Sequence, residues 1–192
     1  MLRNASTCAV LCAWLAASAA AGAAASSPAP SASPRQATTA CANPDLPAAI
    51  LDGPPAEAPK TPLPLITVPA PKAQLHLAVA ADEARRELGL MCVTALRRHA
   101  GMIFVFAHDG PYEFWMKRTL IPLDMVWVAA DGRVTHVAAH VPSSTMDEPD
   151  DKVARRSGSG RYVIELTAGE AALDGLTDGV RLALPALSAS AS

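Results

Sequence analysis

The chain has few aromatic residues and almost no excess of charge of either sign. Phe, Trp and Tyr together make up 4% of the 192 residues, and the formal net charge is −2. A nucleic-acid-binding surface needs basic residues gathered on one face, whereas the charges here are mixed in sign along the chain. We therefore expect no nucleic-acid partner.

Several motifs that mark enzymes and metal proteins are also missing. The chain has no Gly-x-Ser-x-Gly nucleophile elbow, no glycine-rich phosphate loop, no Cys-x-x-Cys pair and no His-Glu-x-x-His motif. These patterns place a nucleophile, a phosphate cradle or metal ligands within reach of one another. Their absence leads us to expect no catalytic residue of these classes, no metal and no cofactor, and it disfavours an enzyme.

Residues 1–25 have the pattern of a secretory signal peptide. Arg3 gives a positive start, an alanine-rich apolar stretch follows, and Ala23-Ala24-Ala25 fits a small-residue cleavage site. This pattern predicts a secreted or periplasmic protein with no membrane span once the signal is removed. The alternative is a signal that is kept as an anchor.

Residues 26–71 are predicted to be a disordered linker rich in Pro, Ala and Ser. They hold 12 of the 17 prolines and have little apolar surface to bury, although residues 41–51 have enough to dock on the domain. Removal of the signal would leave two cysteines, Cys41 and Cys92, in an oxidising compartment. We expect them to form a disulfide. The alternative is that Cys92 is a reactive thiol.

Residues 72–184 are predicted to form one folded, β-rich domain, and residues 185–192 a frayed tail. Short helices are expected after Asp82 and near Ala168. Apolar runs predict about seven short strands, over residues 75–79, 102–106, 112–116, 123–128, 133–141, 162–166 and 180–184. This pattern favours a mainly β fold (α+β with one or two short helices), in the form of a compact antiparallel β-sandwich or barrel.

Turn residues predict how these strands connect. Asp109-Gly110-Pro111 predicts a hairpin between the second and third runs, and Asp131-Gly132 predicts another between the fourth and fifth. The stretch from Ser157 to Gly160 has the composition of a flexible connector. The acidic residues 147–151 are expected to be a solvated loop tip, with a calcium site as the alternative.

Four motifs follow one another in an order typical of a known family. They are Gly89-Leu90-Met91, then Gly101–Phe106, then Trp115-Met116-Lys117-x-Thr119-x-Ile121-Pro122-Leu123-Asp124, then Ile164-Glu165-Leu166-x-Ala168-Gly169. Over about residues 72–184 the chain thus resembles the domain of unknown function 192 family. The resemblance implies a small, secreted or envelope-associated, β-rich single domain, and it supplies no reaction. The chain departs from the family at Val93, where Arg is usual, and at Arg118, where Asn is usual.

Polar residues in these motifs are the candidates for function. Lys117 and Asp124 flank Pro122, so we expect an ion pair of Lys117 with Asp124 or Glu165 that locks the bend. Ligand binding and acid–base catalysis are the alternatives. Trp115 beside charged residues indicates a sugar- or peptide-binding surface, or only a core aromatic residue. The predicted ligand-binding set is Trp115, Lys117, Thr119, Asp124 and Glu165.

Three functions fit these observations. The first is a binding or accessory module for a small polar or cell-envelope ligand. The second is a small hydrolase that uses Lys117, Asp124 and Glu165. The third is a purely structural interaction domain, in which the charges only fix the fold. An enzyme should show these polar groups converging at the base of a concave pocket, and a binding module should show a shallower groove rimmed by aromatic residues. A closed, dry pair of Lys117 and Asp124 with no cavity beside it would favour the structural domain.

Overall fold

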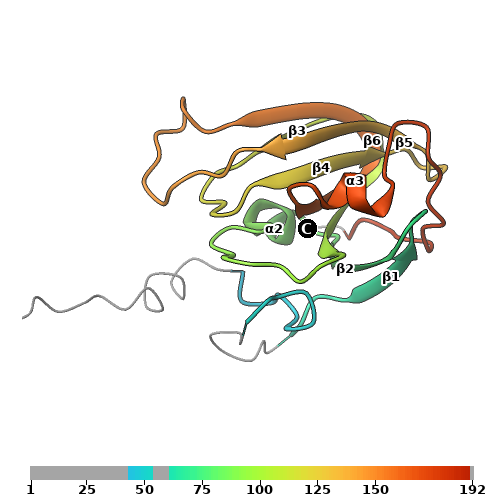
Figure 1. Ribbon diagram of the computed structural model, residues 1–192, viewed down its shortest axis with the longest axis horizontal. Helices are drawn as coiled ribbons and strands as arrows, with labels where there is room; N and C mark the ends of the chain where they lie inside the picture. Colours follow the sequence, from blue (N-terminus) through green and yellow to red (C-terminus); the bar gives the residue numbers. More distant parts are fainter. Residues whose placement is uncertain (1–42, 54–60, 191–192) are drawn as a thin grey trace, which may run out of the picture. The chain divides into compact units, whose positions relative to one another are not determined.

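Six strands form one mixed sheet in the order β1-β2-β3-β6-β4-β5 (Figure 1). The structure, a computed structural model, describes residues 43–53 and 61–190. Its strands and helices are β1 Leu65–Pro69, β2 Gln74–Ala80, α2 Glu83–Leu88, β3 Ala100–Trp115, β4 Leu123–Val128, β5 Val134–Val141, β6 Arg155–Thr167 and α3 Glu170–Asp174. The expected mainly β single domain with two short helices is confirmed.

The sheet is open, and β6 lies between β3 and β4. Only β2 and β3 pair in parallel, and the other neighbours are antiparallel. Strands β1 and β5 form the two edges, so the barrel form of the expected fold is not the observed one. The parallel pair needs a crossover between its strands, and the segment that contains α2 supplies it.

Both faces of the sheet are buried, because successive side chains of each strand point to opposite faces. One face carries Phe104, Met125 and Trp127, and residues before β1 and after α2 cover it, among them Ile50 and Leu90. The second face also has its own apolar core. That core includes Ile103, Val126, Ile164, Ala171 of α3 and Leu182. A sheet buried on both faces explains the continuous apolar runs of β3 and β4.

The expected hairpin between residues 102–106 and 112–116 is wrong, because both runs belong to the single strand β3. Asp109-Gly110-Pro111 lies at an irregularity of the β3–β6 pairing, which shifts register between Val105 and Gly110. Phe106 and Tyr112 stack across this irregularity with ring centroids 3.6 Å apart. The strand therefore continues through a sequence that elsewhere makes a turn.

The stretch from Ser157 to Gly160 is part of β6 and not a flexible connector. Its glycines are needed for close packing. A Cβ on Gly158 would lie 2.5 Å from the Trp127 ring, and one on Gly160 would lie 2.6 Å from the carbonyl oxygen of Val128. These glycines let the neighbouring strand approach, so they mark packing and not flexibility.

The predicted start of the domain at residue 72 is too late. Strand β1 lies inside the predicted linker, and Leu46 and Ile50 are buried in the core, as expected for a docked segment. The tail is also held, because the Ser190 N–H donates to the Ala81 carbonyl oxygen at 2.9 Å. The signal peptide and Cys41 lie outside the described residues, so export and the Cys41–Cys92 disulfide stay predictions.

The turn signals around the remaining elements give a mixed result. Asp82 caps α2 through a hydrogen bond from the Arg85 N–H to Oδ1 (2.9 Å), and β4 pairs with β5 across Asp131-Gly132 as expected. The expected last strand is reduced to an isolated bridge between Arg133 and Arg181.

No helix within residues 43–53 and 61–190 has the length and apolar composition to cross a bilayer.

Candidate functional site

A small pocket lies between α2, the turn after it and the last residues of β3. Its volume is about 40 Å³, which is room for about two water molecules. Four of the five predicted ligand-binding residues line it, namely Trp115, Lys117, Thr119 and Glu165, together with Arg86, Glu87, Leu88, Gly89, Leu90, Met91, Phe104 and Phe114. The pocket therefore gathers residues that lie far apart in the sequence.

Glu165 is the buried polar group of this pocket. It lies on β6, where it pairs with Met102 of β3 and Met125 of β4, and only 5% of its surface is exposed. Among the described residues its carboxyl group has no ion pair and no hydrogen bond. Burial raises the pKa of Glu165 from 4.5 to about 8. At pH 7 the carboxyl group is therefore mostly protonated and can both donate and accept a hydrogen bond.

Aromatic rings form one wall of the pocket. Phe104 and Phe114 meet edge to face with centroids 4.9 Å apart, and Phe114 packs edge to face on Trp127 at 6.1 Å. Trp115, at the end of β3, is 39% exposed. The guanidinium carbon of Arg155 lies 5.1 Å from its ring centroid, and Lys117 Nζ lies at 6.0 Å. The wall is thus fixed at its base and open to solvent at its rim.

Lys117 and Thr119 lie in a tight turn after β3. The Thr119 N–H donates to the Met116 carbonyl oxygen at 3.0 Å, and the Thr119 hydroxyl donates to the Lys117 carbonyl oxygen at 3.3 Å. The Lys117 ammonium pairs with Asp150, and this hydrogen bond lowers the pKa of the Asp150 carboxyl group. Lys117 was expected to pair with Asp124 or Glu165, but its observed partner is Asp150.

Asp124 lies outside the pocket and has a structural role. Its side chain is fully buried on the sheet face opposite Glu165. Oδ1 accepts from the His140 N–H at 2.8 Å, and Oδ2 accepts from the N–H groups of Gly169 (2.8 Å) and Ala171 (3.0 Å). The carboxylate thus fixes the start of α3 against β4 and β5. The expectation that Lys117 and Asp124 face each other is wrong.

Sequence reasoning missed the residues of the α2 wall. Arg86 lines the pocket, and its guanidinium donates to the carbonyl oxygens of Ala81 (2.8 Å) and Val105 (3.1 Å) while covering the Phe106 ring at 5.2 Å. The signal that could have found this wall is the Gly89-Leu90-Met91 motif, which lines the same pocket as Arg86. The sequence analysis assigned no functional role to Arg86.

Comparison with protein families gives a match over most of the domain. Residues 66–184 match the model of the family of domain of unknown function 192, described as an Uncharacterized ACR. The chain belongs to this family. The match includes α2, β3, β6 and the turns that supply the pocket walls, so the pocket lies inside the DUF192 domain. A comparison with curated proteins finds no match.

Two solved structures resemble the DUF192 domain of this chain. A protein of unknown function from Novosphingobium aromaticivorans DSM 12444 is 30% identical with a TM-score of 0.53, covering 69% of this chain and 94% of that one. A candidate transcription regulator from Sinorhizobium meliloti 1021 is 29% identical with a TM-score of 0.51, covering 60% of this chain and 88% of that one. The similarity supports the fold and leaves the ligand open.

Proposed function

We propose that this protein is an exported binding module that takes one polar end group of a small or cell-envelope ligand into the pocket beside Glu165. One observation carries this proposal: the Glu165 carboxyl group is buried and has no partner among the described residues. The carboxyl group lines the pocket, and its oxygens are not among the fully buried atoms without a partner. A ligand in the pocket can therefore supply a hydrogen-bond partner to a group that is otherwise largely removed from water.

The chemistry of the pocket selects among ligands. A protonated carboxyl group pairs with hydroxyl and amide groups, which also donate and accept. The exposed Trp115 ring beside the pocket offers a flat surface to the apolar face of a sugar ring or an acyl group. The volume of about 40 Å³ admits an end group and not a whole molecule. The favoured ligand class is therefore a sugar or an amide-bearing envelope component.

A binding screen tests this proposal. The purified domain is heated with envelope sugars and short peptides, and hits are measured by calorimetry. Glu165→Leu removes the polar group at similar volume, and we expect it to weaken binding about tenfold because one hydrogen bond to a buried group is lost. Lys117→Ala tests the rim in the same way. Leu173→Ala removes an exposed apolar residue on α3 and serves as the control.

The result that counts against the proposal is equally concrete. A ligand bound with equal affinity by the parent and by Glu165→Leu would remove this pocket from the binding site. No binding by any sugar or amide in the panel would favour the structural interaction domain instead.

A hydrolase remains the second candidate because of one observation, the raised pKa of Glu165 in a pocket. Such a group can act as a general acid near neutral pH. The three residues of the original hypothesis are not brought together, because Asp124 lies on the other face of the sheet. Product formation from a bound sugar or amide, lost in Glu165→Gln, would favour the enzyme over the binding module.

Export is the remaining part of the proposal, and it is supported by the signal-like pattern of residues 1–25. N-terminal sequencing of the protein recovered from separated cell fractions tests it. We expect a mature chain that starts near residue 26 in the exported fraction. A full-length chain in the cytoplasm would count against export.

A further inference from the structure

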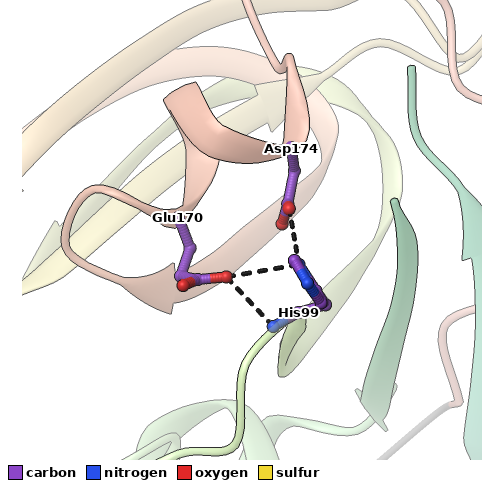
Figure 2. A group of neighbouring side chains, drawn as sticks. All are labelled: His99, Glu170 and Asp174. Carbon is purple, nitrogen blue, oxygen red and sulfur yellow. Dashed lines mark hydrogen bonds and ion pairs between the residues drawn. The ribbon is translucent and has the colours of Figure 1, made fainter. Parts of the chain in front are cut away.

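Three chemically related side chains meet outside the Glu165 pocket. His99 lies in the turn just before β3, and Glu170 and Asp174 are the first and last residues of α3 (Figure 2). One ligand atom from each residue, an imidazole nitrogen and two carboxylate oxygens, lies within 4.8 Å of the others. The pairing of β3 with β6 brings these distant parts of the chain together.

The backbone fixes this cluster, which we call the His99 cluster. The His99 N–H donates to Glu170 Oε2 at 3.0 Å, and the His99 carbonyl oxygen accepts from the His76 N–H at 2.8 Å. The ring nitrogen Nδ1 lies 2.6 Å from Asp174 Oδ1 and 3.3 Å from Glu170 Oε2. Nδ1 therefore faces both carboxylates at once.

A second observation points to the cluster as a ligand site. Asp174 is fully buried, and its Oδ2 has no hydrogen-bond partner among the described residues. Figure 2 shows its carboxylate directed toward His99 and Glu170. A buried carboxylate oxygen without a partner is rare in folded proteins, and an ion or a water molecule usually accounts for it. The free oxygen adjoins the ligand atoms that an ion would need.

We propose that His99, Glu170 and Asp174 bind a divalent transition-metal ion, with Zn²⁺ as the ion to test. Imidazole nitrogen suits zinc and its neighbours, whereas calcium and magnesium take oxygen ligands. Three protein ligands leave a fourth position open to water or to a small molecule.

The geometry fits this ion after a small adjustment. Zinc lies about 2.1 Å from nitrogen and oxygen ligands, so tetrahedral ligands stand about 3.4 Å apart. The distance from His99 Nδ1 to Glu170 already has this value, and the shorter distance to Asp174 must widen by less than about 1 Å. The two carboxylate oxygens lie within 4.8 Å of each other, so they need to approach by at most about 1.4 Å. Binding uses the Nδ1 lone pair, so the ring keeps its proton on Nε2.

The charges around the cluster also favour a cation. Two carboxylates face the site, and the Arg98 guanidinium, with Nε 3.4 Å from Glu170 Oε1, offsets part of their charge. Arg98 is largely exposed, so solvent screens its repulsion of the ion. The cluster can thus hold a divalent cation in exchange for a proton.

Calorimetric titration of the full chain with ZnCl₂ at pH 7.5 tests the proposal. We expect one ion per chain with a dissociation constant in the micromolar range or below. His99→Gln and Glu170→Gln should each weaken binding at least tenfold, because each removes one ligand. His76→Gln removes an exposed imidazole on the adjacent strand β2 and should leave binding unchanged.

Several outcomes would overturn the proposal. These are no stoichiometric binding by the parent, equal binding by the parent and His99→Gln, or equal affinity for Mg²⁺ and Zn²⁺. If a variant does not fold, Co²⁺ bound to the parent decides the question through its visible absorption and through paramagnetic broadening of the His99 ring signals. Broadening confined to other histidines would refute the assignment.

Discussion

The Glu165 carboxyl group should make the stability of this protein fall as the pH rises. Its pKa is about 8 in the folded protein because burial disfavours the charged form, against an ordinary value of 4.5. The folded state therefore keeps this proton over a pH range in which the unfolded chain has lost it. Stability from this source is complete below pH 4.5 and decreases between pH 4.5 and 8.

The magnitude follows from the two pKa values. Their difference of about 3.5 corresponds to about 5 kcal/mol at 1.36 kcal/mol for each pH unit. This is a large share of the 5–15 kcal/mol typical of a single domain. Glu165→Gln keeps the size of the side chain and cannot ionise. The variant should therefore gain stability over the parent by up to about 5 kcal/mol between pH 4.5 and 8.5.

Urea unfolding of both proteins at half-unit pH intervals measures this difference, and the other titrating groups cancel because the two proteins share them. Glu113→Gln is the control, since Glu113 is exposed on neighbouring β3 and pairs with Arg155. Its curve should stay parallel to that of the parent. A stability difference between Glu165→Gln and the parent that is flat within about 1 kcal/mol would show that Glu165 ionises normally.

Three further predictions concern the framework of the site. Asp124→Ala should lower the free energy of unfolding in denaturant by about 3 kcal/mol or more, because three backbone N–H groups lose their acceptor. Asp150→Ala should change it little, so equal effects of the two substitutions would contradict this role. Gly101→Ala should cost about 3 kcal/mol, since its Cβ would overlap the Glu165 carbonyl oxygen. In Gly110→Ala the new Cβ meets only the Tyr112 side chain, with the hydroxyl at 3.5 Å, so equal unfolding midpoints of the two variants would refute this. Reduction of the purified protein should lower the free energy of unfolding by up to about 4 kcal/mol if Cys41 and Cys92 pair. An unchanged unfolding midpoint in Cys41→Ser would exclude the disulfide.

Local chemistry made part of this fold predictable. The Asp82 cap, the Asp131-Gly132 turn and the apolar runs each act over a few residues. The structure has the cap and the turn, and every predicted run except residues 180–184 overlaps a strand. Of the five residues predicted as one ligand-binding set, Glu165, Trp115, Lys117 and Thr119 line one pocket, whereas Asp124 lies on the other face of the sheet.

Long-range register was not predictable in the same way. A shift of one residue in the pairing turns a strand side chain to the other face of the sheet. The sequence therefore does not show whether Asp124 and Glu165 lie on the same face. The cluster of His99 with α3 depends on the same unknown pairing of β3 with β6. Gly158 and Gly160 were wrongly interpreted as part of a flexible connector for a related reason. Only the positions of Trp127 and Val128 on the neighbouring strand show that a side chain would not fit there.

Among the strands of residues 43–53 and 61–190, β6 alone joins the β1-β2-β3 half of the sheet to the β4-β5 half, and it is the last of them in sequence. A nascent chain that ends near residue 150 can form β1, β2 and β3 as one piece and the β4–β5 hairpin as another, with nothing to join them. Because such pieces gain stability only when they dock, the cooperative fold forms when synthesis is nearly complete. If the chain is exported as proposed, this late folding leaves it unfolded long enough to pass through a narrow translocation channel.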